Sequence, residues 1–437
     1  MNPYIQYMYS YPHKTAYRTL EHIRLQDYAH FLTGGNHGLY LHIPFCEAKC
    51  GYCNLFSVPG HPPEEIDLYL DAVERQGRQY RKILSAFQPE FSEITIGGGT
   101  PLLLSTHQLT RMFDLLETYF LYDANRRLAI ETAPNQTTAE KLKILQQAHV
   151  TRISMGIQSF SDQELNTLGR KHNASMARKA LELLSSFHFS CINVDFIYGI
   201  PGQDIKSLLA SLQEALNFAP DEIFLYPLYL HHGAWLAGKP LQRPQPDFTY
   251  CLYQEACAFL KSQNYRQDSM RRFVKIQSKG RQRGFFECGF GTSLALGCGG
   301  RSYLGNLHFC TPYEVSAAKC QGQLKSFLFT EDFSQITNGI LLSQEEMKRR
   351  YIIRHLFIRP GLAQNRYQTH FGTNAIEDFP ILTEWICQGY AQITDIQGIS
   401  FLTLTDTGLG LSDFLGPKLI SRQILEKMKN WEAIHDR

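Results

Sequence analysis

The stretch YLHIPFCEAKCGYCNLFS, residues 40–57, decides the predicted fold and chemistry of this chain. It opens with a short apolar run that predicts a strand, and Cys46, Cys50 and Cys53 follow within eight residues. Three thiolates can therefore meet at one point from a single loop. The next cysteine along the chain is Cys191. A metal site with three sulfur ligands and an open position favours chemistry over a purely structural role.

Two other interpretations of these cysteines stay open. The thiolates could hold zinc, with His42 or His61 as the fourth ligand, or all three could be buried free thiols. Structural zinc sites usually pair one Cys-x2-4-Cys knuckle with a second knuckle, and the sequence has no second one. The spacing therefore disfavours zinc.

The spacing Cys-x3-Cys-x2-Cys, with Tyr52 before the last cysteine, resembles the signature of the radical S-adenosylmethionine (SAM) superfamily. The longer string YLHIPFC resembles one branch of it, the oxygen-independent coproporphyrinogen III oxidases (HemN) and their HemW-like relatives. The resemblance implies a [4Fe-4S] cluster held by Cys46, Cys50 and Cys53, with the fourth iron bound by the amino and carboxylate groups of SAM. It further implies that one electron passed through that iron cleaves SAM to a 5'-deoxyadenosyl radical.

One departure from the resemblance bears on the reaction. The resemblance to the authentic coproporphyrinogen oxidases implies a longer motif, Cys-x3-Cys-x2-Cys-x-Cys. In this chain Leu55 stands at the position of the extra cysteine. HemW-like proteins also lack that cysteine. Two functions are therefore implied: a radical SAM oxidoreductase of porphyrin biosynthesis that acts on a tetrapyrrole, or a HemW-like heme chaperone with no oxidase activity. The enzyme would need an electron donor such as flavodoxin or ferredoxin, and the chaperone could use His308 and Cys310 as heme ligands.

From residue 38 onward, short β-branched or apolar runs alternate with longer helical patterns. The runs predict strands at residues 39–43, 93–96, 127–131, 152–157, 191–198 and 222–226. The patterns between them predict helices at residues 64–86, 106–119, 138–148, 174–187 and 205–218. Such repeats form a parallel sheet with right-handed crossovers. We therefore expect an α/β fold with a partial (β/α)6 barrel. This arrangement resembles the fold of radical SAM enzymes.

In such a fold the functional residues gather at the carboxyl ends of the strands. Beyond the cysteines, the candidates at these ends are Gly98, Gly99, Thr100, Glu131, Gln158, Arg170 and Asp195. The resemblance assigns them to the binding of one or two SAM molecules. It also places Tyr40 beside the cluster and Tyr52 near the adenine. No catalytic residue is predicted beyond these.

Each candidate also has an ordinary structural interpretation. The GGGTP run, residues 97–101, could be a tight turn instead of backbone that approaches a ligand. Glu131 could be a solvated carboxylate at a strand end instead of an acceptor for SAM. Arg170 could form a surface ion pair, and Asp195 needs a partner inside its apolar strand, either a backbone amide or a ligand hydroxyl. Tyr40 and Tyr52 could be core aromatic residues.

The rest of the chain predicts three further parts around a barrel at residues 37–230. An N-terminal arm at 1–36 contains a predicted helix near 19–32. A linker and glycine-rich β-extension follow the barrel at 231–340. The C-terminal part, 341–437, has helical patterns at 344–358, 374–388 and 405–415 and a hairpin at 390–403, which resemble the winged-helix-like domain of the HemN family.

A basic run in the extension has two interpretations. It is a solvated face, or it lies opposite the propionates of a tetrapyrrole, since arginine pairs with carboxylates. The run consists of Arg271, Arg272, Lys275, Lys279, Arg281 and Arg283.

Composition gives no support for a nucleic-acid partner or a membrane span. The 437 residues carry a net charge of +2, from 43 basic and 41 acidic side chains, which gives no electrostatic footprint for nucleic acid. The N-terminus lacks the apolar core of a signal peptide, and no run approaches the ~18 apolar residues of a membrane span. We therefore expect a cytoplasmic protein whose eleven cysteines are free thiols and cluster ligands.

Overall fold

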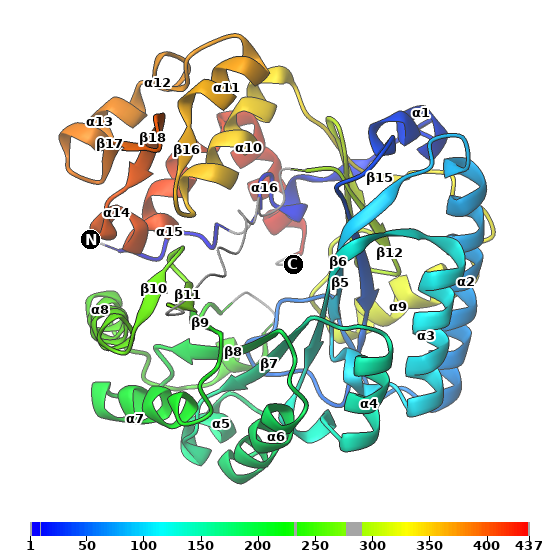
Figure 1. Cartoon of the computed structure of the whole chain (residues 1–437), viewed down its shortest axis with the longest axis horizontal. Helices are drawn as coiled ribbons and strands as arrows, with labels where there is room; N and C mark the ends of the chain where they lie inside the picture. The colour runs from blue at the N-terminus through cyan, green and yellow to red at the C-terminus, as the bar shows by residue number, and fades with distance from the viewer. Residues whose placement is uncertain (1, 9, 231–233, 277–290, 436–437) are drawn as a thin grey trace.

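One large twisted sheet organises the protein in the computed structural model (Figure 1). The structure describes residues 2–8, 10–230, 234–276 and 291–435. Six neighbouring strands run parallel at the centre of the sheet, in the order of the sequence. They are β2 His37–Ile43, β5 Glu90–Gly98, β6 Leu121–Thr132, β7 Arg152–Gln158, β8 Cys191–Tyr198 and β9 Glu222–Pro227. Every predicted strand lies within one of them, so the predicted parallel barrel is confirmed.

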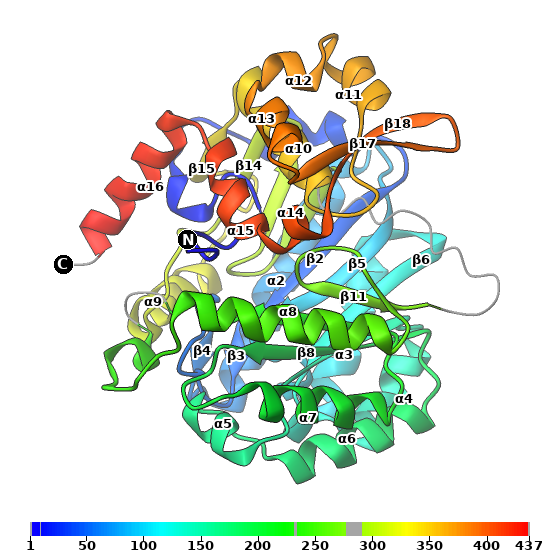
Figure 2. The same cartoon turned by 90° about the vertical axis from the view of Figure 1, so that its left-hand side faces the viewer.

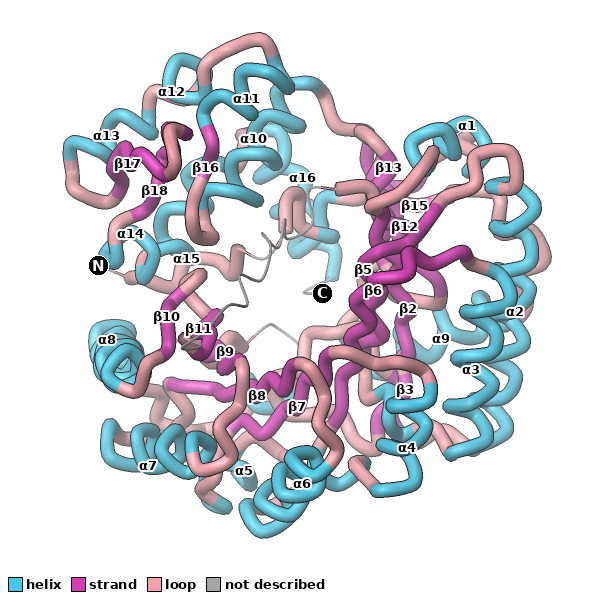
Figure 3. The backbone as a smooth tube through the Cα atoms, viewed as in Figure 1, coloured by secondary structure: helices cyan, strands magenta, loops and turns pink. Residues whose placement is uncertain are grey.

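Helices cover the outer face of these strands, while the strands line the interior (Figure 3). The helices are α2 Pro63–Leu84, α3 Thr106–Tyr119, α4 Ala139–Gln147, α6 Ala174–Ser186 and α7 Ile205–Leu216. The start of α3 follows from a capping box, because Ser105 and Gln108 each accept a backbone N–H of the other. The sequence did not predict the short helix α5 Asp162–Thr167. In the described ranges no helix has both the length and the apolar character that crossing a membrane requires.

The sheet continues beyond both edges of the barrel, to 13 strands within the described residues. Beyond β2 it adds β12 Ser293–Leu296, which is parallel to β2, and then antiparallel strands. These are β13 Arg301–Leu304, β14 Leu307–Cys310, β15 Asn338–Leu341 and β1 Arg18–Thr19. At the other edge β11 Arg272–Lys275 and β10 Tyr265–Gln267 follow β9. The expected β-extension is thus part of the same sheet as the barrel.

The N-terminal arm differs from its prediction. The helix expected near residues 19–32 is present only as α1 Leu25–Tyr28 and the 3-10 turn Ala29–Leu32. Of its first part, Thr19 belongs to β1, which pairs with β15, and residues 20–24 lie in neither a named helix nor a named strand.

The C-terminal elements gather beside the mouth of the barrel (Figure 2). They are α10 Gln344–Leu356, β16 Leu362–Ala363, α11 Gln364–Phe371, α12 Ala375–Asp378, α13 Ile381–Cys387, the hairpin β17 Ala391–Ile396 and β18 Ile399–Leu404, α14 Asp406–Gly410, α15 Ser412–Leu415 and α16 Arg422–His435. The helix predicted at 374–388 is two helices, because Pro380 cannot continue the first one. The helix predicted at 405–415 is likewise divided into α14 and α15, and α11 and α16 were not predicted.

Candidate cofactor site

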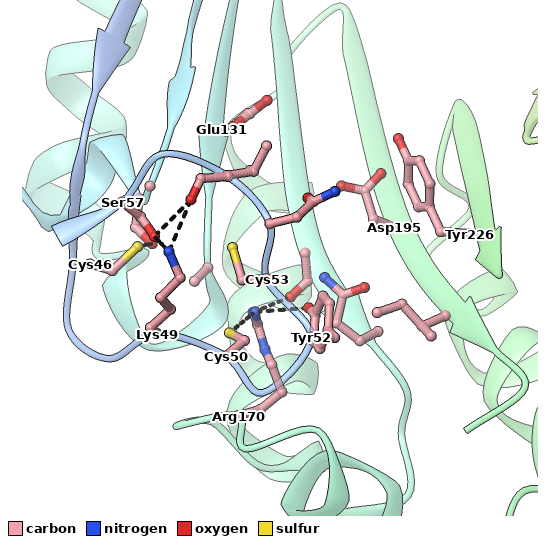
Figure 4. A pocket seen from close by; sticks show the side chains of 18 of the residues that line it. Cys46, Lys49, Cys50, Tyr52, Cys53, Ser57, Glu131, Arg170, Asp195 and Tyr226 are labelled. Carbon is pink, nitrogen blue, oxygen red and sulfur yellow. Dashed lines mark hydrogen bonds between the residues drawn. The ribbon is translucent and has the colours of Figure 1, made fainter. Parts of the chain in front are cut away.

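A cavity of about 440 Å³ lies at the carboxyl ends of the parallel strands (Figure 4). Nearly all predicted site residues line it: Cys46, Cys50, Tyr52, Cys53, Gly98, Gly99, Thr100, Glu131, Gln158, Arg170 and Asp195. Tyr40 is the exception. It lies on β2, on the same face of the strand as His42, and its hydroxyl is 3.1 Å from Nδ1 of His42.

Short-range contacts close the cysteine loop, residues 46–57, on itself. Its two ends are joined by pairing of β3 Phe45–Cys46 with β4 Val58–Pro59. Lys49 Nζ donates to the carbonyl of Leu55 at 3.1 Å and to Ser57 Oγ at 3.2 Å, which ties the middle of the loop to its end. The three thiols consequently face the cavity from one loop (Figure 4).

The arrangement of the thiols bears on the kind of metal site. Among the described residues, no three His, Cys, Asp or Glu side chains are placed so that together they could bind one metal ion. The three sulfurs therefore do not meet at one point in the way that a single bound ion would require. His42 Nε2 lies 2.8 Å from the carbonyl of Phe56, and His61 Nδ1 lies 3.2 Å from that of Val58. The described residues therefore do not provide the four tetrahedrally placed ligands that zinc needs. In a cubane cluster each thiolate binds a different iron, and three thiols spaced around one cavity suit that chemistry.

The glycine run lets the end of β5 approach the cysteine loop. A Cβ on Gly99 would lie 2.4 Å from the carbonyl oxygen of Phe45 and 2.9 Å from Cys46 Sγ. A Cβ on Gly97 would lie 2.9 Å from the carboxyl of Glu131. Side chains here would displace a predicted cluster ligand and a predicted SAM ligand, so glycine is required for the shape of the cavity.

The amides of this run are already used inside the protein. Gly98 N donates to Glu131 Oε2 at 3.1 Å, and Gly99 N and Thr100 N donate to backbone carbonyls at 2.8 Å. These three amides are therefore not available to a ligand carboxylate. The hydroxyl of Thr100, 3.9 Å from Cys46 Sγ, still faces the cavity.

Two carboxyl groups lie across the cavity from the thiols (Figure 4). Burial raises the pKa of Glu131 to about 7, and the nearby charge of Asp195 adds to the rise. Burial likewise raises the pKa of Asp195 to about 6. Asp195 accepts hydrogen bonds from Asn193 Nδ2 at 2.8 Å and Ser154 Oγ at 3.5 Å, so side chains and not a backbone amide are its partners. Carboxyls poised near neutrality respond strongly to a cationic ligand.

Arg170 and Gln158 both have unusual environments. Arg170 Nη1 lies 3.1 Å from Cys50 Sγ and 3.4 Å from the Tyr52 hydroxyl, and its buried Nε has no hydrogen-bond partner among the described residues. The surface ion-pair interpretation of Arg170 is therefore wrong. Gln158 follows an irregularity in β7 and has a φ of 72°, a left-handed conformation that costs energy outside glycine.

The sequence missed an aromatic wall on the side of the cavity formed by β9. Tyr226 and Tyr229 line it together with Tyr7 of the N-terminal arm. The rings of Tyr7 and Tyr229 are stacked, with centroids 6.1 Å apart, and the guanidinium of Arg271 lies 3.9 Å above the ring of Tyr7. Arg271 also forms a buried ion pair with Asp413 of α15. The rule that placed the other candidates at carboxyl ends could have found Tyr226, whereas the arm gave no such signal.

Among the described residues of the basic run, Arg272 and Lys275 do not line the cavity. Arg272 pairs with the buried Glu222, and Lys279, Arg281 and Arg283 lie outside the described residues. His308 and Cys310, the heme ligands considered above, are buried on β14 and do not line the cavity.

Comparison with known proteins agrees with this geometry. Residues 40–215 match the family described as the Radical SAM superfamily. The heme chaperone HemW of Haemophilus influenzae is 30% identical over 275 residues, which cover 61% of this chain and 70% of that protein. The chain belongs to the radical SAM family of HemW and HemN proteins. Within this HemW/HemN family, the oxygen-independent coproporphyrinogen III oxidase of Escherichia coli is 26% identical over 382 residues, 83% of this chain and 81% of the oxidase.

A solved structure shares the HemW/HemN fold over almost the whole length. Coproporphyrinogen III oxidase (HemN) from Escherichia coli matches with a TM-score of 0.77 and 21% identity, covering 97% of this chain and 96% of the oxidase. The predicted family and fold class are thus confirmed. Membership implies a [4Fe-4S] cluster and SAM, and the three thiols of the cysteine loop are the donor set that such a cluster takes.

Proposed function

We propose that this HemW/HemN-family protein holds a [4Fe-4S] cluster on Cys46, Cys50 and Cys53 and binds SAM beside it. The observation that carries the proposal is that three thiols of one loop and the carboxyls of Glu131 and Asp195 line the same cavity. When bound, cluster and SAM would supply the one-electron cleavage of SAM.

The side chains around the thiols have distinct tasks in this proposal. Glu131 accepts a hydrogen bond from the amino group of SAM, and the positive charge of the SAM sulfonium favours the ionised form of its carboxyl. Asp195, fixed by Asn193 and Ser154, accepts hydrogen bonds from the ribose hydroxyls. The guanidinium of Arg170 stays beside Cys50 and offsets the negative charge of the thiolates.

The aromatic wall supports a flat, acidic substrate, namely a tetrapyrrole. Tyr7, Tyr226 and Tyr229 offer ring faces to a conjugated macrocycle. The buried Nε of Arg271 has no hydrogen-bond partner among the described residues, and a guanidinium is suited to a carboxylate such as a propionate. The proposed reaction is oxidation of the tetrapyrrole, in the manner of coproporphyrinogen III oxidase.

A second candidate is a heme chaperone of the HemW kind. Two observations favour it. The relative named a heme chaperone is 30% identical to this chain. Leu55, which is 49% exposed, stands at the position of the extra cysteine in the oxidase motif. In this case the cavity holds heme without turnover, and the cluster and SAM regulate its release.

One experiment tests the first proposal and then separates the two candidates. The protein is reconstituted anaerobically with iron and sulfide, and SAM and dithionite are added. We expect 5'-deoxyadenosine and methionine from the wild type and neither from Cys50→Ala, with Cys387→Ala, an exposed cysteine of α13, as the matched control. A wild type that loads a cluster but forms no 5'-deoxyadenosine would contradict SAM cleavage.

The substrate is then tested in two parallel assays. Decarboxylation of coproporphyrinogen III during SAM cleavage supports the oxidase. Tight heme binding, transfer of that heme to an acceptor apoprotein and no decarboxylation support the chaperone.

A further inference from the structure

The outer side of the cysteine loop carries an exposed indole. Trp235, in the 3-10 turn Trp235–Gly238, is 56% exposed. A Cβ on Gly51 would lie only 2.7 Å from ring atom Cε3 of this indole, and Leu236 N donates to the carbonyl of Gly51 at 2.8 Å. Gly51 directly follows Cys50 in the chain. A solvent-facing aromatic ring therefore contacts backbone one residue away from a proposed cluster ligand.

Three chain segments meet at this point, and we call their outer surface the Trp235 face: residues 48–60, 165–173 and 234–245. Gly51 N donates to the carbonyl of Leu168 at 3.0 Å, and Gly169 approaches both Gly51 and the indole of Trp235. The segment before α8 Pro246–Ser262 projects from the body of the protein (Figure 2). Segment 234–245 contributes no residue to the cavity lining and is thus accessible without entry into the cavity, whereas Leu55 and Lys171 of the other two segments also line the cavity.

Charges within the bounds of the Trp235 face are of one sign, while the exposed Glu47 and Asp247 stand one and two residues outside those bounds. The three segments contain five basic residues and no Asp or Glu, in a chain whose net charge is only +2. Two of the five, Lys49 and Arg170, turn inward to Ser57 and Cys50. The other three are exposed: Lys171, Lys239 and Arg243. Lys239 Nζ lies 4.7 Å from the centre of the Trp235 ring, so positive charge borders the indole directly.

Apolar side chains complete this surface. Leu241 is 40% exposed on the same segment as Trp235, and Leu55 is 49% exposed on the cysteine loop. Exposed aromatic and aliphatic groups inside a rim of one charge are typical of a contact surface for another protein. Electron-transfer complexes bury little area and rely on such complementary charge for fast, brief encounters.

We propose that the Trp235 face is where a small one-electron carrier protein docks, through an acidic surface around its redox centre, to reduce the cluster. This inference rests on the proposed function, because it needs the cluster on the cysteine loop. In the step, the carrier is oxidised by one electron and the cluster is reduced by one. No bond or proton changes place, and the cavity stays available to SAM and substrate.

The test compares two sources of electrons in the reconstituted full-length protein. SAM cleavage is driven either by dithionite, which needs no docking site, or by a reduced flavodoxin as the probe carrier. The variant is the charge reversal Lys239→Glu with Arg243→Glu, both exposed and outside the cavity lining. The matched control reverses two exposed lysines of the outer helices, Lys143→Glu with Lys179→Glu.

We expect the variant to lose at least 10-fold in the flavodoxin-driven rate at low ionic strength, with its dithionite-driven rate unchanged. The Kd of oxidised flavodoxin, measured by interferometry on the protein without SAM, should rise at least 10-fold in parallel, and the control should change neither quantity. Trp235→Ala should weaken flavodoxin binding in the same assay. An unchanged Kd and flavodoxin-driven rate in the charge-reversal variant, or an equal loss in the control, would overturn the docking site while the dithionite result still supports the proposed function. Absence of dithionite-driven cleavage in the wild type would overturn both.

Discussion

The carboxyl of Glu131 gives a sharp test of the site, because its ionisation opposes folding. Burial raises its pKa from the ordinary 4.5 to about 7. The folded protein therefore holds this proton more tightly than the unfolded chain, and stability is lost as the pH rises from about 4.5 through 7. Each tenfold change in proton affinity is worth about 1.4 kcal/mol, so the full cost at pH 8 is about 3 kcal/mol.

Replacing this residue by glutamine should remove that cost. In Glu131→Gln the side chain is neutral, keeps its size and can still accept the hydrogen bond from Gly98 N. We expect the variant without cofactors to be more stable than the wild type by about 3 kcal/mol at pH 8 and by less than about 1 kcal/mol at pH 5. The measurement is the free energy of unfolding in urea at both pH values. Glu182→Gln, at an exposed position of α6, is the control and should change stability by less than about 0.5 kcal/mol.

The same substitution should have the opposite effect on the ligand. If Glu131 accepts a hydrogen bond from the amino group of SAM, its loss removes a charged hydrogen bond and weakens SAM binding to the cluster-loaded protein about 10- to 100-fold. A variant no more stable than the wild type at pH 8, or a stability gain that is the same at pH 5, would refute the assignment of a buried carboxyl to this position. Unchanged SAM affinity would refute its role as a ligand.

Two further substitutions test the packing around the site. Gly99→Ala places a Cβ 2.4 Å from the carbonyl oxygen of Phe45, directly before the cysteine loop, so we expect at least a fivefold loss of bound iron and sulfide after reconstitution. The control Gly322→Ala, whose added Cβ meets nothing within 4 Å, should show no loss. Equal loading of the two variants would contradict the close approach. Asp413→Asn removes the charge that pairs with buried Arg271 and should lower the free energy of unfolding in denaturant by about 3 to 5 kcal/mol. The control Asp406→Asn, at an exposed ion pair, should lower it by less than about 1 kcal/mol. Similar losses in the two variants would show that the first pair is not buried.

Local pattern was sufficient to predict the barrel and most of the cavity. The six strands and five of the outer helices followed from hydrophobic period, since each buries one face against its neighbours. Because parallel strands end at one edge, the same reading predicted that Glu131, Asp195 and the cysteines would lie together. Among the residues predicted to bind the cluster or SAM, only Tyr40 does not line the cavity; its hydroxyl lies 3.1 Å from Nδ1 of His42.

What the sequence could not supply depends on contacts between distant segments. Tyr7 reaches the cavity from the N-terminus, and Arg271 is held there by Asp413, 142 residues away. The strand β1 forms only because β15 offers an edge. The acceptors of the Gly98, Gly99 and Thr100 amides also required coordinates, because a GGGTP run permits many turns. Pairing of this kind leaves no local periodicity to detect.

The most direct test of the central claim concerns the iron that the three cysteines leave without a protein ligand. The cluster is reconstituted, reduced and mixed with SAM whose amino group carries 15N, and electron–nuclear double resonance is recorded. We predict a 15N hyperfine coupling that shows the amino group bound to iron, and its loss with unlabelled SAM. A cluster with no coupling to the label, or with a protein side chain on the fourth iron, would contradict the account.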